Sequence, residues 1–130
     1  MKKACVLIVD DQEEMLDLLT LVLKGEGFYP ATAIDAKDAL NLLREFRPAV
    51  IITDLMMPGI SGIDLIKIVR SNPDLAQIPI LAMSADSTGL LPEAEKAGAT
   101  ESLRKPLDLD QLVQRLRDFI PYSAPMSNQP

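Results

Sequence analysis

The sequence predicts a doubly wound α/β fold, in which helices cover both faces of a five-stranded parallel sheet. Five short apolar segments alternate along the chain with five segments of helical periodicity, as in successive strand–helix units. The central apolar segment, Ala49–Thr53, is rich in β-branched residues and lacks polar alternation, which is typical of a strand buried on both faces. The length of 130 residues suits one domain with a single core.

The N-terminal segment contains a predicted strand, a helix and a second strand. Ala4–Val9 is an apolar run of strand length that ends at two aspartates. Apolar residues then recur at helical spacing over Glu13–Lys24, and two glycines follow as a stop signal. Phe28–Ala33 predicts a second strand, but Pro30 lacks the amide that a central strand needs. We therefore expect this second strand at an edge of the sheet.

The middle of the chain predicts a helix, the central strand, a loop and another helix. Asp35 can cap a helix that ends near Phe46, before a proline. The central strand follows, and Asp54 comes directly after it. Prolines and glycines then mark a loop. The next helix opens at Ser61 or Gly62 and ends before a Ser-Asn-Pro stop signal.

The C-terminal part predicts two more strands and two more helices. Ile78–Met83 is an apolar run of strand length, and a short helix is expected over Pro92–Ala97, where a glycine closes it. A short fifth strand lies near Glu101–Leu103. Asp108 and Gln111 resemble a capping box for the last helix, which carries apolar residues at helical spacing.

Composition and charge narrow the classes of function. The chain has 13 basic and 19 acidic residues, a net charge of −6, and no basic stripe, so we expect no direct nucleic-acid partner. No apolar run approaches the length of about 20 residues that a membrane span needs. Cys5 is the one cysteine and lies in an apolar run, which excludes an internal disulfide and favours a reducing, cytoplasmic compartment.

Polar residues stand at four of the five predicted strand ends. In doubly wound sheets, ligands bind beyond the carboxyl ends of the strands, at the point where the strand order reverses. With the flavodoxin-like strand order 2-1-3-4-5, Asp10 and Asp11 lie beside Asp54. Ser84 and Lys105 then approach from the other side. Each residue alone has an ordinary interpretation as a helix cap, a turn residue, a strand-end hydroxyl or a surface charge. Their joint placement favours a common site.

Carboxylates gathered in one place need a cation. Two of them about 5 Å apart repel by about 3 kcal/mol at an effective dielectric constant near 20. Hard oxygen ligands suit Mg²⁺, whereas a zinc site is disfavoured because the chain has no histidine and one cysteine. A metal-held phosphoryl group beside a carboxylate, with a lysine and a hydroxyl, supplies the parts of in-line phosphoryl transfer.

Five short motifs follow one another along the chain. They are Val9-Asp10-Asp11, Asp54 with Met57-Pro58-Gly59 and Gly62, Ser84-Ala85, Lys96-Ala97-Gly98-Ala99, and Lys105-Pro106. Together they resemble the receiver domain of two-component response regulators, over residues 2–120. The resemblance implies a signalling switch rather than an enzyme that acts on a separate metabolite. Residues 121–130 have the composition of a disordered tail or the start of a linker.

The resemblance implies a phosphoacceptor and a metal site. Asp54 would take a phosphoryl group from the phosphohistidine of a histidine kinase or a phosphotransfer protein. Asp54 and Asp11 would bind Mg²⁺ directly, Asp10 would act mainly through water, and the backbone carbonyl of Met56 would supply another ligand. A downstream protein partner or an output domain would then respond to the phosphorylated state.

The resemblance also assigns the residues around the phosphoryl group. Ser84 would donate to one phosphoryl oxygen and Lys105 would pair with another. In the family, the peptide bond before the position of Pro106 is usually cis. Many receivers carry an aromatic residue where this chain has Ser102. In those receivers the aromatic ring moves together with the hydroxyl that binds the phosphoryl group, and this chain has no ring at that position.

Other functions are compatible with parts of this pattern. A degenerate receiver that binds partners without phosphorylation would lack Asp54, Lys105 or the acidic pair. A phosphatase resembling the haloacid dehalogenases also uses a strand-end aspartate with Mg²⁺, but it needs a second acid where Met56 stands. A flavodoxin-like electron carrier would need a hydroxyl- and glycine-rich loop after the first strand, where this chain is acidic.

Overall fold

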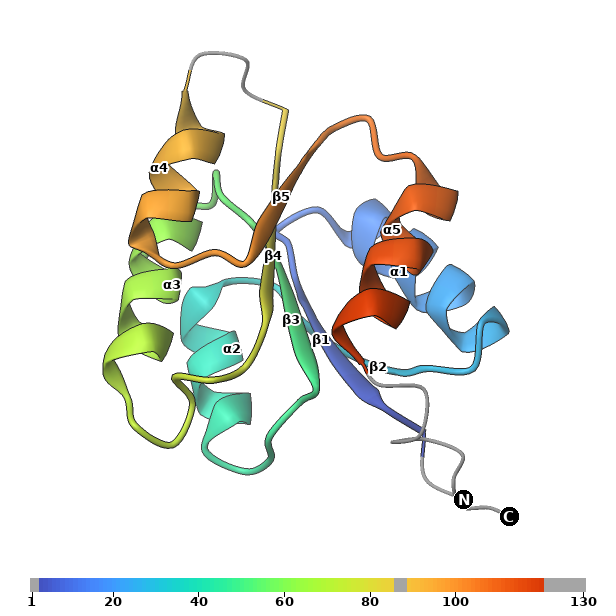
Figure 1. The fold of residues 1–130 in the computed structure, drawn as a ribbon, viewed down its shortest axis with the longest axis horizontal. Helices are drawn as coiled ribbons and strands as arrows, with labels where there is room; N and C mark the ends of the chain where they lie inside the picture. The colour runs from blue at the N-terminus through green and yellow to red at the C-terminus, as the bar shows by residue number, and fades with distance from the viewer. Residues whose placement is uncertain (1–2, 86–88, 121–130) are drawn as a thin grey trace.

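Strands and helices alternate strictly along the chain, as the apolar segments predict. The computed structural model describes residues 3–85 and 89–120, and the predicted tail at 121–130 lies outside them (Figure 1). The elements are β1 (Cys5–Val9), α1 (Glu13–Gly25), β2 (Tyr29–Ala33), α2 (Ala36–Leu43), β3 (Val50–Asp54), α3 (Gly62–Ser71), β4 (Ile80–Ser84), α4 (Leu90–Ala97), β5 (Glu101–Arg104) and α5 (Leu109–Phe119). Among the described helices, none combines the length and the apolar character needed to cross a membrane.

The five strands form one parallel sheet in the order β2-β1-β3-β4-β5, which confirms the predicted order. β3 is central, with Thr53 in register with Val9 of β1 and with Ala82 of β4. β2 lies at an edge, where Pro30 removes no hydrogen bond from a central ladder. The strand order reverses between β1 and β3, so Asp54 at the end of β3 lies at the switch point.

Two layers of helices cover the sheet. Figure 1 shows α2, α3 and α4 on one side and α1 and α5 on the other. Side chains along each strand alternate between these layers. On β3, Ile51 packs in the core on the side of α2, α3 and α4, whereas Val50 and Ile52 pack in the core on the side of α1 and α5. Both faces are therefore apolar, which explains why the strand sequences lack polar alternation.

Two element boundaries differ from the expectation because local turns intervene. β4 begins at Ile80 rather than Ile78, since the amide of Ile78 closes a turn by donating to the carbonyl of Leu75, at 3.1 Å. α2 ends at Leu43, and the residues up to Phe46 form hydrogen-bonded turns instead of a further helical turn. Ile78 stays in the core without belonging to β4.

α4 is longer than the sequence predicts. It begins at Leu90 rather than Pro92. A proline is tolerated in the first turn of a helix, because backbone amides there have no intrahelical acceptor. Leu90 and Leu91 are half-buried and pack against the core on this side of the sheet. This packing favours a core role for the two leucines over the alternative of a free partner-binding patch.

Side chains cap three of the helices at their N-termini. Asp35, Ser61 and Asp108 each accept the backbone amide three residues further on, at 2.8 to 3.1 Å. α1 differs, because its N-cap is Gln12, whose amide donates to Oδ1 of Asp10 at 2.9 Å. Asp10 thus organises the turn between β1 and α1 instead of capping the helix itself.

The first turn of α3 packs directly against the end of β3. The amide of Gly62 donates to the carbonyl of Leu55 at 3.1 Å and so closes the intervening loop. A Cβ atom at position 62 would meet the carbonyl oxygen of Asp54 and lie 2.6 Å from Cα of Leu55. Only glycine allows this approach, so residue 62 fixes how closely α3 covers the Asp54 peptide.

We expect Gly62→Ala to destabilise the protein by about 1–3 kcal/mol, because the added methyl group must displace backbone rather than a flexible side chain. Urea unfolding measures the change. Gly25→Ala is the matched control, since a Cβ atom at position 25 meets nothing within 4 Å. Equal unfolding midpoints for the two variants would contradict the close-approach argument.

Candidate functional site

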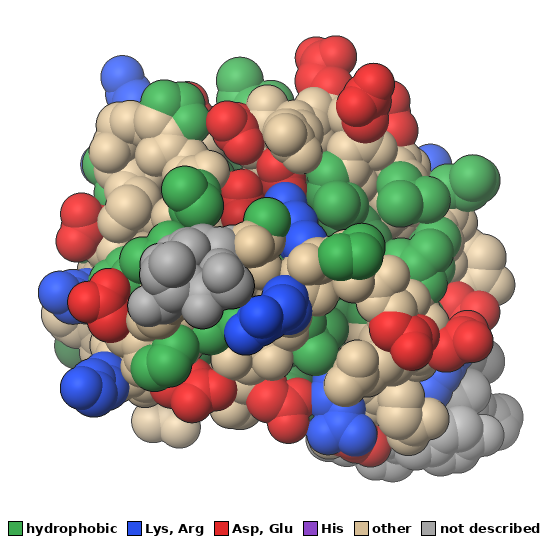
Figure 2. Space-filling model, turned by 90° about the horizontal axis from the view of Figure 1, so that it is seen from above, with side chains coloured by type: hydrophobic (Ala, Val, Ile, Leu, Met, Phe, Trp, Pro, Cys, Tyr) green, Lys and Arg blue, Asp and Glu red, His purple; other side chains and the backbone are tan. Residues whose placement is uncertain are grey.

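The carboxyl end of the sheet carries a cluster of charged side chains. Asp10 and Asp11 follow β1, Asp54 ends β3, and Lys105 follows β5. Figure 2 looks onto this end of the molecule and shows acidic and basic side chains side by side near the middle of the face. Carboxylate oxygens of the three aspartates lie within 4.8 Å of one another. The structure thus brings the three predicted acidic residues together.

Lys105 reaches into the acidic cluster from the end of β5. Its Nζ lies 3.0 Å from Oδ2 of Asp10 and 3.6 Å from Oδ1 of Asp54. The amide of Lys105 donates to the carbonyl of Ser84 at 3.0 Å, and the peptide bond to Pro106 is cis, as the resemblance implies. One ammonium group therefore faces three carboxylates, so the cluster keeps an excess of negative charge.

The three carboxylates differ in burial. Asp10 is fully buried and Asp54 is 5% exposed, whereas Asp11 is exposed. A buried carboxylate is unfavourable unless it is paired, and Asp10 accepts from both the amide of Gln12 and the ammonium of Lys105. Asp11 and the outer side of Asp54 are left to face solvent, where a ligand could approach.

The pKa of the Asp54 carboxyl lies above its ordinary value of 3.8. Burial is the largest cause, because surroundings of low polarity disfavour the charged form. The charge of Asp10 also raises this pKa, whereas Lys105 and the backbone amides of Met56 and Leu55 lower it. The ionised form of Asp54 is thus destabilised by its surroundings, and a further cation would relieve this.

The acidic cluster opens into a hollow of about 240 Å³. Its lining combines predicted site residues with neighbours: Asp11, Gln12, Asp54, Met56, Ala85 and Lys105. Met56 is exposed here, and its carbonyl as a metal ligand stays a prediction. Sequence reasoning missed Gln12 and Ala85 as lining residues. Their positions could have indicated this, because Gln12 directly follows Asp11 and Ala85 directly follows Ser84, which were both predicted site residues.

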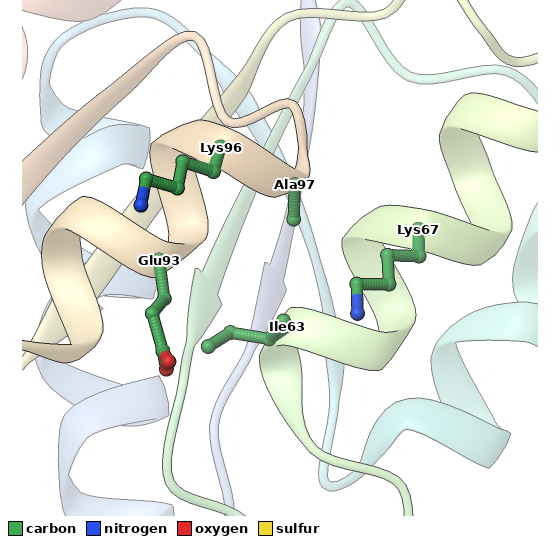
Figure 3. A pocket seen from close by; sticks show the side chains of 5 residues that line it. All are labelled: Ile63, Lys67, Glu93, Lys96 and Ala97. Atoms are coloured by element: carbon green, nitrogen blue, oxygen red, sulfur yellow. The ribbon is translucent and has the colours of Figure 1, made fainter.

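A second depression, of about 270 Å³, lies between α3 and α4. Its lining residues are Ile63, Lys67, Glu93, Lys96 and Ala97. Figure 3 shows that the charged ends of these side chains lie apart from one another rather than around one point. Converging charged groups at the switch point of the sheet are what a phosphate or metal site needs, so the acidic hollow is the candidate site.

Comparison with known families identifies this arrangement. The model of the response regulator receiver domain matches residues 6–117, a span that includes every predicted site residue. The chain belongs to this family. It is therefore a receiver domain of the two-component response regulators and a regulatory module of phosphorylation-dependent signalling.

Solved receiver domains share the whole fold. The chemotaxis response regulator CheY4 of Vibrio cholerae is 30% identical, with a TM-score of 0.85 over 92% of this chain and 100% of that one. The receiver domain of the Francisella response regulator 1452 is 32% identical, with a TM-score of 0.82 over 90% of this chain and 96% of the other. The order and packing of the elements are thus those of other receivers.

Curated relatives are longer than this chain. The DNA-binding response regulator MtrA of Mycobacterium tuberculosis is 37% identical over 114 residues, which are 86% of this chain and 48% of MtrA. The response regulator MprA of Mycolicibacterium vanbaalenii is 32% identical over 121 residues, which are 92% of this chain and 52% of MprA. The chain thus spans about half the length of these relatives.

The prediction that nucleic acid is no direct partner is wrong at the level of these relatives, because MtrA is named as DNA-binding. The net charge of −6 describes the surface of these 130 residues. That surface corresponds to about half of MtrA, so its charge carries no information about the remainder. The exclusion was therefore drawn too widely.

Ser102 and Ser84 have distinct surroundings. The hydroxyl of Ser102 on β5 donates to Oε2 of Glu95 on α4, at 2.8 Å. The resemblance places Ser102 where many receivers carry an aromatic residue, and in this chain its side chain is hydrogen-bonded to the neighbouring helix α4. Ser84 is fully buried at the end of β4, in register with Arg104. Its contact with a phosphoryl oxygen stays a prediction.

Asp54→Asn should change how stability depends on pH in the metal-free protein. The folded pKa of Asp54 lies above its unfolded value, so wild type loses stability as the pH rises from 3.8 through the folded pKa. The variant lacks this titration. The difference in unfolding free energy should therefore grow with pH above 3.8, in favour of the variant. Urea unfolding in a chelator over a pH series measures it, and a difference that shrinks with rising pH would contradict the raised pKa.

Asp11→Asn should stabilise the metal-free protein by about 1 kcal/mol and weaken Mg²⁺ binding, because it removes one of three repelling charges at a solvent-screened position. Urea unfolding in a chelator measures the first effect, and calorimetric titration with Mg²⁺ measures the second. Asp17→Asn, at an exposed position on α1, is the matched control. A lower unfolding midpoint for Asp11→Asn than for wild type would refute the repulsion argument.

Proposed function

We propose that Asp54 accepts a phosphoryl group from the phosphohistidine of a histidine kinase or a phosphotransfer protein. A carboxylate oxygen of Asp54 attacks the phosphorus atom as the bond from phosphorus to the histidine nitrogen breaks. The imidazole keeps that electron pair and takes up a proton, and Asp54 becomes an acyl phosphate. The observation that carries this proposal is that Lys105 and three carboxylates meet in one charged cluster at the switch point of the sheet.

The donor set of the cluster fits Mg²⁺. Three carboxylates offer oxygens within 4.8 Å of one another, and one side of the cluster faces solvent, which suits an ion that keeps several waters. Asp11 and Asp54 would be direct ligands, Asp10 would act mainly through water, and the carbonyl of Met56 would complete the protein ligands. When bound, Mg²⁺ neutralises the charge of the phosphoryl oxygens.

Lys105 and Ser84 would orient the transferred group. The ammonium of Lys105 lies 3.6 Å from the Asp54 carboxylate, so it can pair with a phosphoryl oxygen added there. Ser84 ends the neighbouring strand, and its hydroxyl would donate to a second oxygen. The site thus modifies its own aspartate, and the domain acts as a regulatory acceptor rather than as an enzyme on a separate metabolite.

The same residues weigh against two of the alternatives. A receiver that works without phosphorylation has no need of Asp54, Lys105 and the acidic pair together, yet all of them lie within one charged cluster. An aspartyl phosphatase of the haloacid dehalogenase type needs an acid two residues after its nucleophile, and Met56 occupies that position.

The relatives suggest how the signal leaves this domain. MtrA is a DNA-binding response regulator of about twice the matched length, so an output domain is one route, and a separate protein partner is the other. We assign the receiver unit to residues 2–120 and the tail or the start of a linker to residues 121–130. The cytoplasmic location stays a prediction from composition.

Acetyl phosphate with Mg²⁺, or a phosphorylated histidine kinase, should add one phosphoryl group to wild type and none to Asp54→Asn. The reason is that the amide of asparagine cannot act as the carboxylate nucleophile. Intact-protein mass spectrometry counts the added groups, with Asp17→Asn as a variant that should label like wild type. Equal labelling of wild type and Asp54→Asn would remove Asp54 from this role.

A further inference from the structure

Thr53, the residue before the proposed phosphoacceptor, is a buried polar side chain in an otherwise apolar strand. It is fully buried in β3 and shares the strand face of Ile51, which packs in the core on the side of α2, α3 and α4. A buried hydroxyl without a hydrogen bond is unfavourable. Oγ1 of Thr53 donates to the backbone carbonyl oxygen of Asp54 at 2.8 Å. The hydroxyl therefore uses its proton in a hydrogen bond to the peptide group between Asp54 and Leu55.

That peptide is held from several directions. The amide of Leu55 belongs to the same peptide plane as the carbonyl of Asp54, and it donates to the carbonyl of Met83 on β4 at 3.0 Å. On the other side, the Cα of Gly62 approaches the Asp54 carbonyl so closely that no Cβ fits. The Thr53 hydroxyl thus binds one end of a plane whose other end is bound to β4.

The orientation of this plane bears on the Asp54 side chain. A peptide plane is rigid, so fixing the Asp54 carbonyl and the Leu55 amide fixes how the main chain leaves the Cα of Asp54. The carboxylate direction depends on that Cα, as does the position of the Leu55 and Met56 amides that face it. Phosphoryl transfer requires the attacking oxygen in line with the leaving nitrogen, so small rotations slow it strongly.

We infer that Thr53 is a positioning residue for phosphoryl transfer, because its hydroxyl fixes the Asp54–Leu55 peptide and thereby aims the Asp54 carboxylate. The inference rests on the proposed role of Asp54 as phosphoacceptor. Thr53 is not among the residues that line the acidic hollow. Its effect on the site passes through the backbone, so the hydroxyl, rather than the bulk of the side chain, sets the direction of the Asp54 carboxylate.

Three variants separate the hydroxyl from the packing. Thr53→Val keeps the shape and removes the donor, Thr53→Ser keeps the donor and removes a methyl group, and Thr32→Val makes the same change at an exposed position on β2. Rates of phosphorylation by acetyl phosphate with Mg²⁺ are measured over a concentration series. We expect Thr53→Val to lower the maximal rate by about tenfold with a similar half-saturating concentration, since misorientation affects the transfer step. Thr53→Ser and Thr32→Val should stay within about twofold of wild type.

A second measurement is independent of phosphorylation. In metal-free protein, the amide NMR signals of Leu55 and Met56 should move in Thr53→Val and stay close to wild type in Thr53→Ser. Unchanged signals and rates in Thr53→Val, or equal losses in Thr53→Val and Thr53→Ser, would overturn the positioning role. A wild type that takes no phosphoryl group would refute the proposed function instead, and the amide signals alone would then decide whether the hydroxyl fixes the peptide.

Discussion

Repulsion among three carboxylates at one edge of the sheet is the constraint on which the site depends. The fold places Asp10, Asp11 and Asp54 so that their oxygens lie within 4.8 Å, and it supplies one nearby ammonium, that of Lys105. Full neutralisation by protein cations would remove the electrostatic reason for a metal cation to bind. Incomplete neutralisation makes the site responsive, because every added positive charge lowers its free energy.

The rest of the structure must hold such a site together, since the charges themselves repel one another. The supports are backbone contacts: Gly62 lets α3 seat against the Asp54 carbonyl, and the amide of Lys105 donates to the carbonyl of Ser84. The Thr53 hydroxyl adds a side-chain bond to the same peptide. Backbone groups cannot change rotamer, so they preserve the geometry better than long side chains would.

Sequence reasoning succeeded where topology leaves little choice. Right-handed crossovers between parallel strands put residues that follow apolar runs at one edge, so the meeting of Asp11, Asp54 and Lys105 was predictable. Sequence reasoning failed for contacts between segments that lie far apart in the chain and share no local sequence pattern. The guanidinium of Arg70 donates to three carbonyls in two loops, among them that of Gly98, and no periodicity indicates this. The bond made by Thr53 was equally hidden, because a threonine in a strand looks like any β-branched residue.

The failed exclusion of nucleic acid has a different physical origin. The field of a surface charge is screened within about 8 Å in physiological salt, so net charge describes the surface that carries it and nothing beyond. Part of the acidic character of this chain comes from the site itself, because three aspartates gathered in one cluster add negative charge. The net charge of this chain therefore bears on the partners of its own surface. It gives no information about the other half of relatives such as MtrA and MprA.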